Sequence, residues 1–277
     1  MANTKTRFGK IPIFCINLER RQDRWREFTA QKGLQGLDIK RWQGVDGSLI
    51  DITNDPRVSM RVKRNIRKKL RRSWEDIYTP GAVGCYLSHM EIWKWLSTSD
   101  STCCIVLEDD CVIPDNFAEK ITTLWEESEI IQNERYDCCL LHRTCGKVET
   151  NSLDANDDKV ESMEWFFNTT GYIITRNCAK KLIENALPIQ VHVDKYIGLY
   201  KLVYNLKIYR VRENWLNITS SQSISDIDSK DCDLCRIPSN FTETHRAVEI
   251  YDFYLGRISQ IAMIGMLGWW SIRGIMG

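Results

Sequence analysis

The sequence predicts an α/β protein with a mixed sheet flanked by helices, and three segments carry this prediction. The run Cys103–Glu108 is apolar and ends in consecutive acids, which is typical of a buried parallel strand. Residues 11–16 form a second apolar run, and the polar turn after it leads into a helix, as in a nucleotide-binding crossover. A third strand, Gly171–Thr175, precedes a helix predicted for Asn177–Ala186, which Pro188 stops.

Composition and charge are those of an ordinary globular protein. The 277 residues are 43% apolar and 27% charged, with a formal net charge of +1. This charge is no signature of nucleic-acid binding, and no nucleic-acid partner is expected. Most of the eleven cysteines lie in apolar, strand-like runs without a disulfide framework. Residues 1–10 lack the long apolar stretch of a signal peptide, so a reducing, cytoplasmic setting is predicted.

Local signals place the other elements. A helix is predicted to begin at Thr79 or Pro80, with Ser88 and His89 in its first turns. Residues 145–162 are polar and acidic and are predicted to form a long loop. Further strands are expected within residues 136–141 and 207–211.

Residues 61–72 contain the strongest local concentration of positive charge. Val62, Ile66 and Leu70 recur every four residues, which predicts a short helix with one thin apolar stripe. One interpretation is a solvated helix face. The other is contact with an acidic membrane surface, nucleic acid or an anionic acceptor, which leaves a peripheral position at a membrane open.

The C-terminal end of the chain is predicted to lie outside the main domain. We expect one α/β domain over residues 1–235 and a helical extension over residues 236–277. Residues 258–272 contain no charge and are too short to span a membrane, which needs about 20 apolar residues. They are predicted to form a docking or membrane-surface helix, or else a core helix.

The acids Glu108, Asp109 and Asp110 indicate a binding site. Adjacent carboxylates repel one another and lose hydration unless positive charge lies among them. Mg²⁺ or Mn²⁺ prefers such oxygen ligands and can carry a phosphorylated ligand. Ligands of open α/β sheets bind at the carboxyl ends of strands, which is where these acids fall. A solvated acidic turn is the alternative.

Four segments then occur in a specific order: residues 16–24, 45–47, 81–89 and 106–110. This combination resembles glycosyltransferase family 25, which includes lipopolysaccharide glycosyltransferases and relatives of the collagen β-galactosyltransferases. The resemblance covers roughly residues 11–230 and is strongest up to residue 110. It implies a GT-A type, Rossmann-like fold and metal-dependent, inverting transfer of a hexose, galactose or glucose, from a UDP-sugar. The acceptor would be a hydroxyl of a glycan, a lipid-linked sugar or a protein.

The resemblance also implies residue roles. Asp110 would bind Mn²⁺ or Mg²⁺, with Glu108 as a second metal ligand or on the donor ribose, while the orientation of Asp109 stays open. Asp194 and Asp226 are the candidate general bases, although each is equally well an exposed or helix-capping aspartate. The donor pocket is assigned to Asn17, Arg20, Arg21, Asp46, Gly47, Gly84, Ser88, His89, Glu108 and Asp109.

Two other functions remain open at this point. A catalytically inactive module could bind membranes or polyanions through residues 61–72 and the C-terminal tail, but such a descendant need not keep three adjacent acids. A metal-dependent phosphohydrolase could use the same carboxylates. It would lack a second cluster of acids or histidines at the spacing of a two-metal site.

Overall fold

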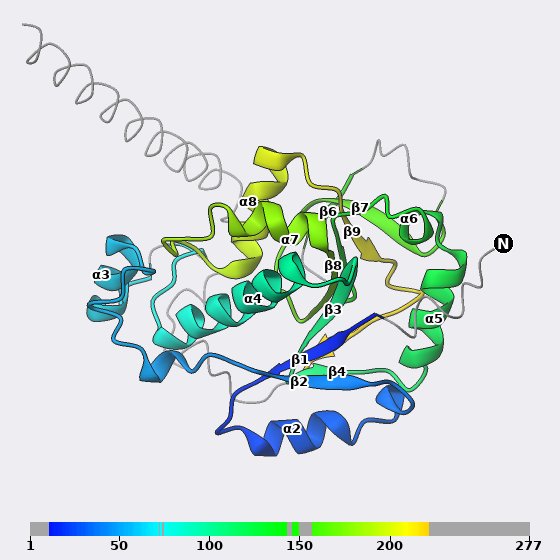
Figure 1. The fold of residues 1–277 in the computed structure, drawn as a ribbon, viewed down its shortest axis with the longest axis horizontal. Coiled ribbons are helices and arrows are strands. Elements are labelled where there is room, and N and C mark those ends of the chain that lie inside the picture. The colour runs from blue at the N-terminus through cyan, green and yellow to red at the C-terminus, as the bar shows by residue number, and fades with distance from the viewer. Residues whose placement is uncertain (1–10, 72, 74, 143–145, 150–156, 222–277) are drawn as a thin grey trace, which may run out of the picture. The chain divides into compact units, whose positions relative to one another are not determined.

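An eight-stranded sheet forms the centre of the computed structural model, which describes residues 11–71, 73, 75–142, 146–149 and 157–221. Two short strands form a separate pair, one of them just after the central strand and the other late in the chain. In sheet order the strands are β2 (Ile39–Gln43), β1 (Ile13–Asn17), β3 (Cys103–Glu108), β8 (Gly171–Thr175), β5 (Cys138–Leu140), β9 (Ile208–Val211), β7 (Val160–Phe166) and β6 (Gly146–Val148), with β4 (Cys111–Val112) and β10 (Thr219–Ser220) as the pair (Figure 1).

Strand directions bring several carboxyl ends to one edge of the sheet. Strand β1 is parallel to both β2 and β3, and β5 is parallel to β9. Strand β8 runs antiparallel between β3 and β5, so these two strands point the same way. The predicted mixed α/β sheet is therefore confirmed, and it has the Rossmann-like form expected of a GT-A type fold.

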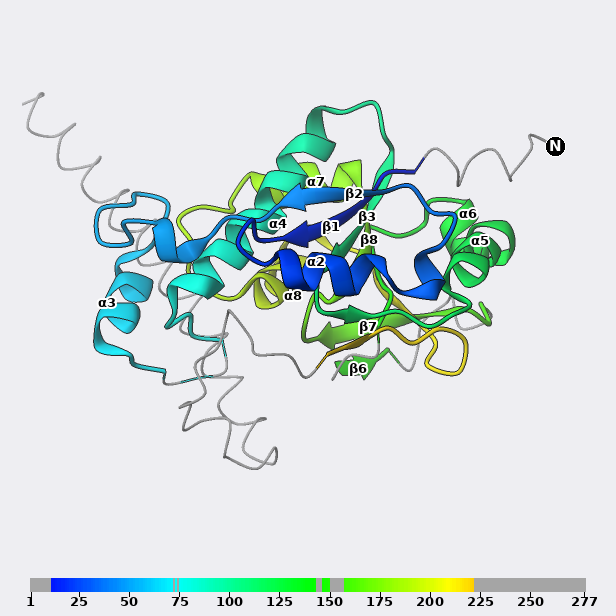
Figure 2. The same cartoon turned by 90° about the horizontal axis from the view of Figure 1, so that it is seen from below.

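Helices cover both faces of the sheet. Helices α4, α7 and α8 pack together on one face, and α2 lies with α5 on the other (Figures 1 and 2). Among the described residues, no helix is long and apolar enough to cross a membrane. The helices are α2 (Gln22–Thr29), α3 (Met60–Lys68), α4 (Pro80–Thr98), α5 (Phe117–Glu127), α6 (Glu129–Gln132), α7 (Arg176–Ile183) and α8 (Val193–Tyr204), with 3₁₀ turns η1 (Lys32–Leu34) and η2 (Gly47–Leu49).

Alternation along β3 divides the core between these two layers. Cys103, Ile105 and Leu107 belong to the apolar cluster that includes side chains of α2, α5 and α6. Because successive side chains of a strand point to opposite faces, Cys104 and Val106 face the layer of α4. All five side chains are buried, which fits a central strand covered on both sides.

The predicted loop over residues 145–162 is wrong at both ends. Strand β6 begins at Gly146 and β7 at Val160, and the two strands pair in antiparallel fashion. Acidic residues in β7 made this segment resemble a loop in the sequence. Glu161 forms a cross-strand ion pair with Arg210 of β9, at 2.8 Å, so this charge has a partner within the sheet.

Helix predictions were correct in position and less so in extent. Thr79 caps α4 by accepting a hydrogen bond from the Ala82 amide, and Pro80 is its first residue, as predicted. Ser88 and His89 lie in the third turn of this helix, not in its first turns, so the helix N-terminus does not act on them directly. The basic helix α3 ends before Lys69, whose φ of 48° is left-handed.

The cysteines of the described residues are free thiols that serve as small core residues. The pKa of Cys104 is raised well above its ordinary value, chiefly by burial, so this thiol stays protonated. The predicted cytoplasmic setting remains a prediction. Buried thiols belong to Cys15, Cys103, Cys104, Cys111, Cys138, Cys139 and Cys178, and that of Cys85 is half-buried.

Some of the sequence predictions fall outside the described residues. These are the helical extension over residues 236–277, with its possible membrane-surface segment 258–272, and the candidate base Asp226. The boundary between residues 235 and 236 likewise stays a prediction.

A close backbone approach joins α4 to the turn after β2. A Cβ atom on Gly84 would lie 2.3 Å from the Val45 carbonyl oxygen and 2.6 Å from the Gly47 amide nitrogen. The glycine assigned to the donor pocket from the sequence therefore has a packing role, because it lets the turn at Val45–Gly47 rest directly on the helix.

We predict that Gly84→Ala lowers the free energy of unfolding by about 1–3 kcal/mol, because both atoms it would meet belong to the backbone. Gly198→Ala is the matched control. Its Cβ would meet nothing within 4 Å inside α8, so it should gain about 0.5–1 kcal/mol from helix propensity. Urea unfolding measures both. Equal stability of Gly84→Ala and the wild type would contradict the packing role.

Candidate functional site

The predicted acids lie where β3 ends, and the structure gives each a different environment. Glu108 is the last residue of β3 and lies beside His89 of α4. Asp109 lies on the opposite side, beside Arg24 of α2. This divergence follows from strand alternation, which sends consecutive side chains to opposite faces.

Both carboxylate oxygens of Asp109 contact neighbouring side chains of the fold. Its Oδ1 lies 3.0 Å from Arg24 Nη1, and its Oδ2 accepts a 2.6 Å hydrogen bond from Asn17 Nδ2. Asn17 Oδ1 in turn accepts a 2.8 Å hydrogen bond from Arg41 Nε. Burial raises the pKa of Asp109, while Asn17 and Arg24 oppose that rise. Asn17 is thus a buried link between β1 and the acidic turn, and its donor-binding role stays a prediction.

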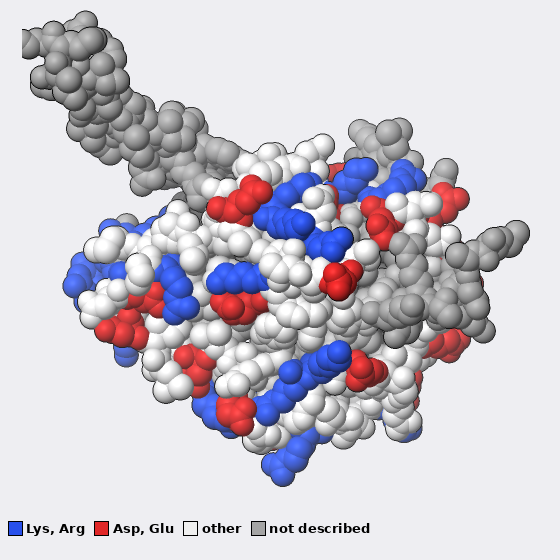
Figure 3. All heavy atoms as spheres, viewed as in Figure 1, with Lys and Arg blue, Asp and Glu red and all other residues white. Residues whose placement is uncertain are grey.

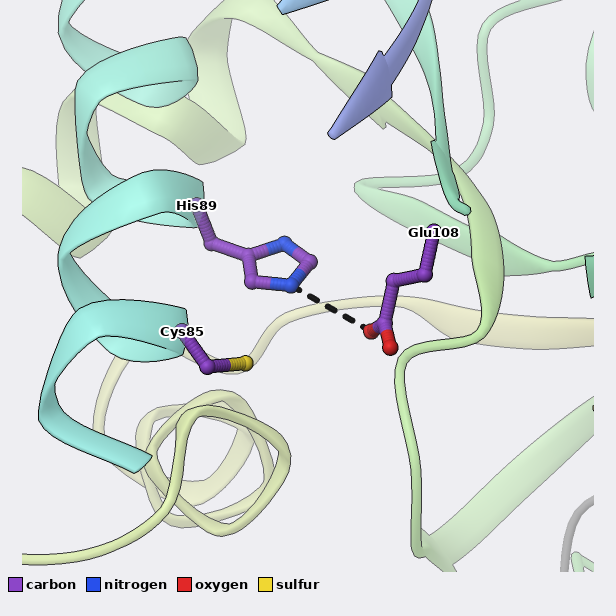
Figure 4. Close-up of side chains that lie close together, drawn as sticks. All are labelled: Cys85, His89 and Glu108. Atoms are coloured by element: carbon purple, nitrogen blue, oxygen red, sulfur yellow. Dashed lines mark ion pairs between the residues drawn. The ribbon is translucent and has the colours of Figure 1, made fainter. Parts of the chain in front are cut away.

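Glu108 is held at one of its two oxygens. Its Oε1 accepts a 2.9 Å hydrogen bond from Thr169 Oγ1 and lies 3.3 Å from His89 Nε2 (Figure 4). Cys85 Sγ completes a cluster in which one ligand atom per residue lies within 4.8 Å of the others. Burial pushes the pKa of Glu108 up, but His89 and Thr169 outweigh it and the pKa is lowered. Glu108 is therefore an ionised carboxylate with Oε2 left over for a ligand.

Asp110 is the acid whose charge is outweighed by its surroundings, although Arg24 attracts it. Its Oδ1 is buried and has no hydrogen-bond partner within the described part of the chain. Burial, and then repulsion by Glu108 and Asp109, raise its pKa to about 7. A buried carboxylate oxygen without a partner, near an ionised carboxylate, fits a hard divalent cation, which takes oxygen ligands. Burial keeps the pKa of the Cys85 thiol well above its ordinary value, so this sulfur suits the cation less.

The turn between β2 and η2 forms the opposite wall of the site. Ser88 Oγ accepts a 2.8 Å hydrogen bond from the Val45 amide and donates to the Gly84 carbonyl oxygen. This fixes Asp46, which accepts a 2.6 Å hydrogen bond from Arg20 Nε. Ser88 thus holds the turn against α4, while Asp46 and Arg20 supply the charged groups of this wall.

A pocket lies between the acids, α4 and this turn. Larger hollows of about 330 and 360 Å³ lie around Thr102 and Tyr136, at the opposite edge of the sheet, without such a group of acids. The pocket at the acids is lined by Ile16, Leu18, Arg20, Arg24, Val45, Asp46, Gly47, Gly81, Cys85, Ser88, His89, Glu108, Asp109 and Asp110.

Most of the residues assigned to the donor pocket are therefore brought together. Asn17, Arg21 and Gly84 do not line it. Arg21 instead forms a 2.9 Å ion pair with Asp23 on the exposed start of α2. Its assignment to the donor stays a prediction.

Asp194 lies near the start of α8. Its Oδ2 accepts a 2.9 Å hydrogen bond from the Asn168 amide, and its Oδ1 accepts one from the Lys195 amide. It is close enough to influence the pKa of both Cys85 and His142, which places it on the site side of the molecule. The two backbone bonds support the turn before α8, and a carboxylate with both still has lone pairs to accept a proton.

His142 is a candidate that the sequence reasoning missed. It lies two residues after the end of β5 and is 2% exposed, with Nδ1 3.1 Å from the Gly171 carbonyl oxygen. Its Nε2 makes no hydrogen bond of ordinary geometry within the described residues. Burial lowers its pKa, against the Gly171 and Phe167 carbonyls and Glu108, so the ring is neutral. The signal was available, because the residue ends an apolar run at the same sheet edge as the acids.

The chain is similar to known proteins of one family. Residues 10–197 match the profile of glycosyltransferase family 25, described as an LPS biosynthesis protein. A "Glycosyltransferase 25 family member" of Aedes aegypti is 27% identical over 220 residues, which cover 77% of this chain and 33% of that protein.

Two further relatives carry collagen-related names. A "Procollagen lysyl hydroxylase and glycosyltransferase" of Acanthamoeba polyphaga mimivirus is 31% identical, over 75% of this chain and 25% of that protein. A "Procollagen galactosyltransferase 1-B" of Xenopus laevis is 27% identical, over 67% and 30%. The chain thus matches only a quarter to a third of the length of these relatives. The family match spans more than half of the chain and contains the acids, α4 and the wall, and so this protein belongs to glycosyltransferase family 25.

Proposed function

We propose that this protein is a metal-dependent, inverting glycosyltransferase that moves a hexose from a UDP-sugar to a hydroxyl group. The observation that carries the proposal is Asp110, a buried carboxylate oxygen without a partner beside the ionised Glu108 at the mouth of the family motif. Such an arrangement costs stability in the absence of a cation and becomes favourable when one binds.

Asp110 and Glu108 would hold Mn²⁺ or Mg²⁺ together. When bound, the cation acts as a Lewis acid toward the departing nucleoside diphosphate. Arg20 lies across the pocket and offers a permanent positive charge to the donor phosphates, while its bond to Asp46 fixes its direction. Asp109 stays with Arg24 and keeps the turn that carries Asp110 in place.

The choice of sugar rests on the relatives, and the choice of base rests on the groups near the acids. The names of relatives favour galactose as the hexose. The acceptor class stays open among a glycan, a lipid-linked sugar and a protein hydroxyl. In a direct displacement, the acceptor hydroxyl must lose its proton to a base. Asp194 is the described carboxylate on the site side that can accept it, and His142 is the second candidate because its free Nε2 carries a lone pair.

A second function is favoured by helix α3. Its residues Arg64, Arg67, Lys68 and Lys69 are exposed and form no ion pair with the rest of the described chain, whereas Arg61 is paired with Asp76. Figure 3 shows basic side chains at the end of the molecule where Figure 1 places α3. Unpaired cations on one protruding helix suit an anionic surface. We propose that this face holds the protein at a membrane that carries its acceptor.

The metal proposal predicts that Asp110→Asn abolishes Mn²⁺-dependent binding of a UDP-sugar. The wild type is titrated calorimetrically with UDP-galactose and UDP-glucose, with Mn²⁺ and with chelator. One donor should bind only with metal, and the variant should bind neither. Unchanged donor affinity in Asp110→Asn would contradict the assignment, and metal-independent binding would remove the cation from the proposal.

The same variant makes a prediction for stability. The pKa of Asp110 is about 7 in the folded protein against 3.8 as the ordinary value, so its stability contribution is full below the lower value and lost as pH rises through the higher one. Metal-free Asp110→Asn should therefore melt at a higher temperature than metal-free wild type at pH 8, with a smaller difference at pH 5. Thermal unfolding at both pH values measures this. An equal melting temperature at pH 8 would contradict the buried, uncompensated charge.

The base assignment predicts that Asp194→Asn lowers turnover by at least about 100-fold, the lower end for general-base catalysis, with donor affinity unchanged. His142→Gln is the comparison and should cost less. Both are measured as UDP release from UDP-galactose with a panel of acceptors, alongside donor binding by calorimetry. A greater loss in His142→Gln would transfer the role to the histidine.

The membrane proposal predicts that the triple change Arg64→Gln, Arg67→Gln and Lys68→Gln weakens sedimentation with vesicles that contain anionic lipid. A control triple, Arg26→Gln, Lys32→Gln and Lys40→Gln, removes the same charge from exposed positions elsewhere and should sediment like the wild type. Absence of wild-type binding to any vesicle, or equal loss in both triples, would overturn the proposal.

A further inference from the structure

A chain of buried polar groups runs from the core of the α4 layer to Glu108. Trp93 Nε1 donates to Tyr172 Oη at 3.1 Å, and Tyr172 Oη lies 2.9 Å from His89 Nδ1. His89 Nε2 faces Glu108 Oε1 at 3.3 Å (Figure 4). Trp93 and His89 are completely buried, and so is Tyr172. Each of these groups therefore depends on its neighbours in the chain for hydrogen bonds.

The donor and the acceptor of each hydrogen bond in this chain can be assigned from the protons that each group carries. The indole nitrogen of Trp93 can only donate, so it occupies a lone pair of the Tyr172 oxygen. Burial raises the pKa of the Tyr172 phenol well above its ordinary value, so the hydroxyl keeps its own proton. Within the described residues, His89 Nδ1 is the one acceptor that proton can reach. If His89 donated from Nδ1 instead, the buried Tyr172 hydroxyl proton would have no partner, which costs about 1–3 kcal/mol.

We propose that His89 is a positioning residue, held by Trp93 and Tyr172 with its proton on Nε2, that fixes the Glu108 carboxylate by its Oε1 and leaves Oε2 for the cation or the donor. The proposal rests on the proposed function only for what Oε2 then binds. Thr169 donates a hydrogen bond to the same Oε1 that His89 faces, so both side chains leave the second oxygen unused. Partners that orient a metal ligand in this way are a general feature of metal sites.

This assignment excludes His89 from the metal ligands, although Cys85, His89 and Glu108 lie close enough to suggest a three-ligand site. A nitrogen that carries a proton has no lone pair for a metal. The His89 Nε2 contact is long, and its geometry falls outside that of a hydrogen bond. Contacts of this kind often tighten when a ligand arrives.

His142 provides an internal comparison with the opposite arrangement. Its Nδ1 faces the Gly171 carbonyl oxygen, which can only accept, so the proton must be on Nδ1. Its Nε2 is then the lone-pair nitrogen. Two buried histidines near Glu108 are thus assigned opposite tautomers by the hydrogen bonds behind them.

Nitrogen NMR tests the tautomers without any metal or donor. The protein contains four histidines, and two-bond proton–nitrogen correlations of ¹⁵N-histidine-labelled, metal-free protein at pH 8 show which ring nitrogen carries the proton. His89→Gln and His142→Gln assign the signals. We expect the proton on Nε2 of His89 and on Nδ1 of His142. A proton on Nδ1 of His89, alone or with Nε2 also protonated, would overturn the proposal.

Metal affinity then tests what the tautomer does. The amide of Gln can place an N–H near the position of His89 Nε2, whereas Leu cannot. We expect His89→Leu to weaken Mn²⁺ binding about 10- to 100-fold, as for other partners of metal ligands, and His89→Gln to retain most of the wild-type affinity. Tyr172→Phe, which keeps the ring and loses the hydroxyl, should fall between them.

These outcomes separate the two proposals. Equal loss in His89→Gln and His89→Leu, with both variants folded by circular dichroism, would make His89 a metal ligand and refute the positioning role. A wild type that binds no divalent cation would remove the proposed function, while the tautomers measured in the metal-free protein would still decide the proton assignment.

Discussion

The ion pair between Arg24 and Asp109 is the interaction on which the rest of the site depends. It joins the first helix to the end of the central strand, and the buried Asn17 extends it to β1. Removal of one partner from such a buried pair leaves an uncompensated charge and typically costs about 3–5 kcal/mol. Because Asp109 is fixed in this way, the turn that carries Asp110 is tied to α2 and β1, while Glu108 contacts His89 of α4.

The fold was largely predictable because its signals are local. The apolar run of β3 ends in acids, Thr79 and Pro80 start α4, and both features follow from chemistry within a few residues. Strand β7 escaped prediction for a non-local reason. Its Glu161 is stabilised by Arg210 on a neighbouring strand, and no pattern within the segment itself reveals that partner.

The sequence indicated which residues lie near the candidate site, but it could not show which neighbour each side chain contacts. Asn17, Arg20 and Arg21 lie within five residues of one another in the sequence and were all predicted to contact the donor. The structure uses Asn17 to hold Asp109, Arg20 to line the pocket and Arg21 to pair with Asp23. Which neighbour a polar side chain meets depends on the path of the turn after β1, and that path depends in turn on contacts with the Asp109 region.

The three acids show how one motif combines stability with binding. Asp109 pairs with an arginine, and Glu108 accepts a hydrogen bond from Thr169 and remains ionised. At Asp110, burial and the two neighbouring acids outweigh the attraction of Arg24, so its charge is destabilising at neutral pH. A fully compensated triplet would be more stable but would offer a cation no uncompensated oxygen. On the proposed function, the free energy lost at Asp110 would be recovered when a cation binds, and the buried chain behind His89 would hold the ring beside Glu108 for that step.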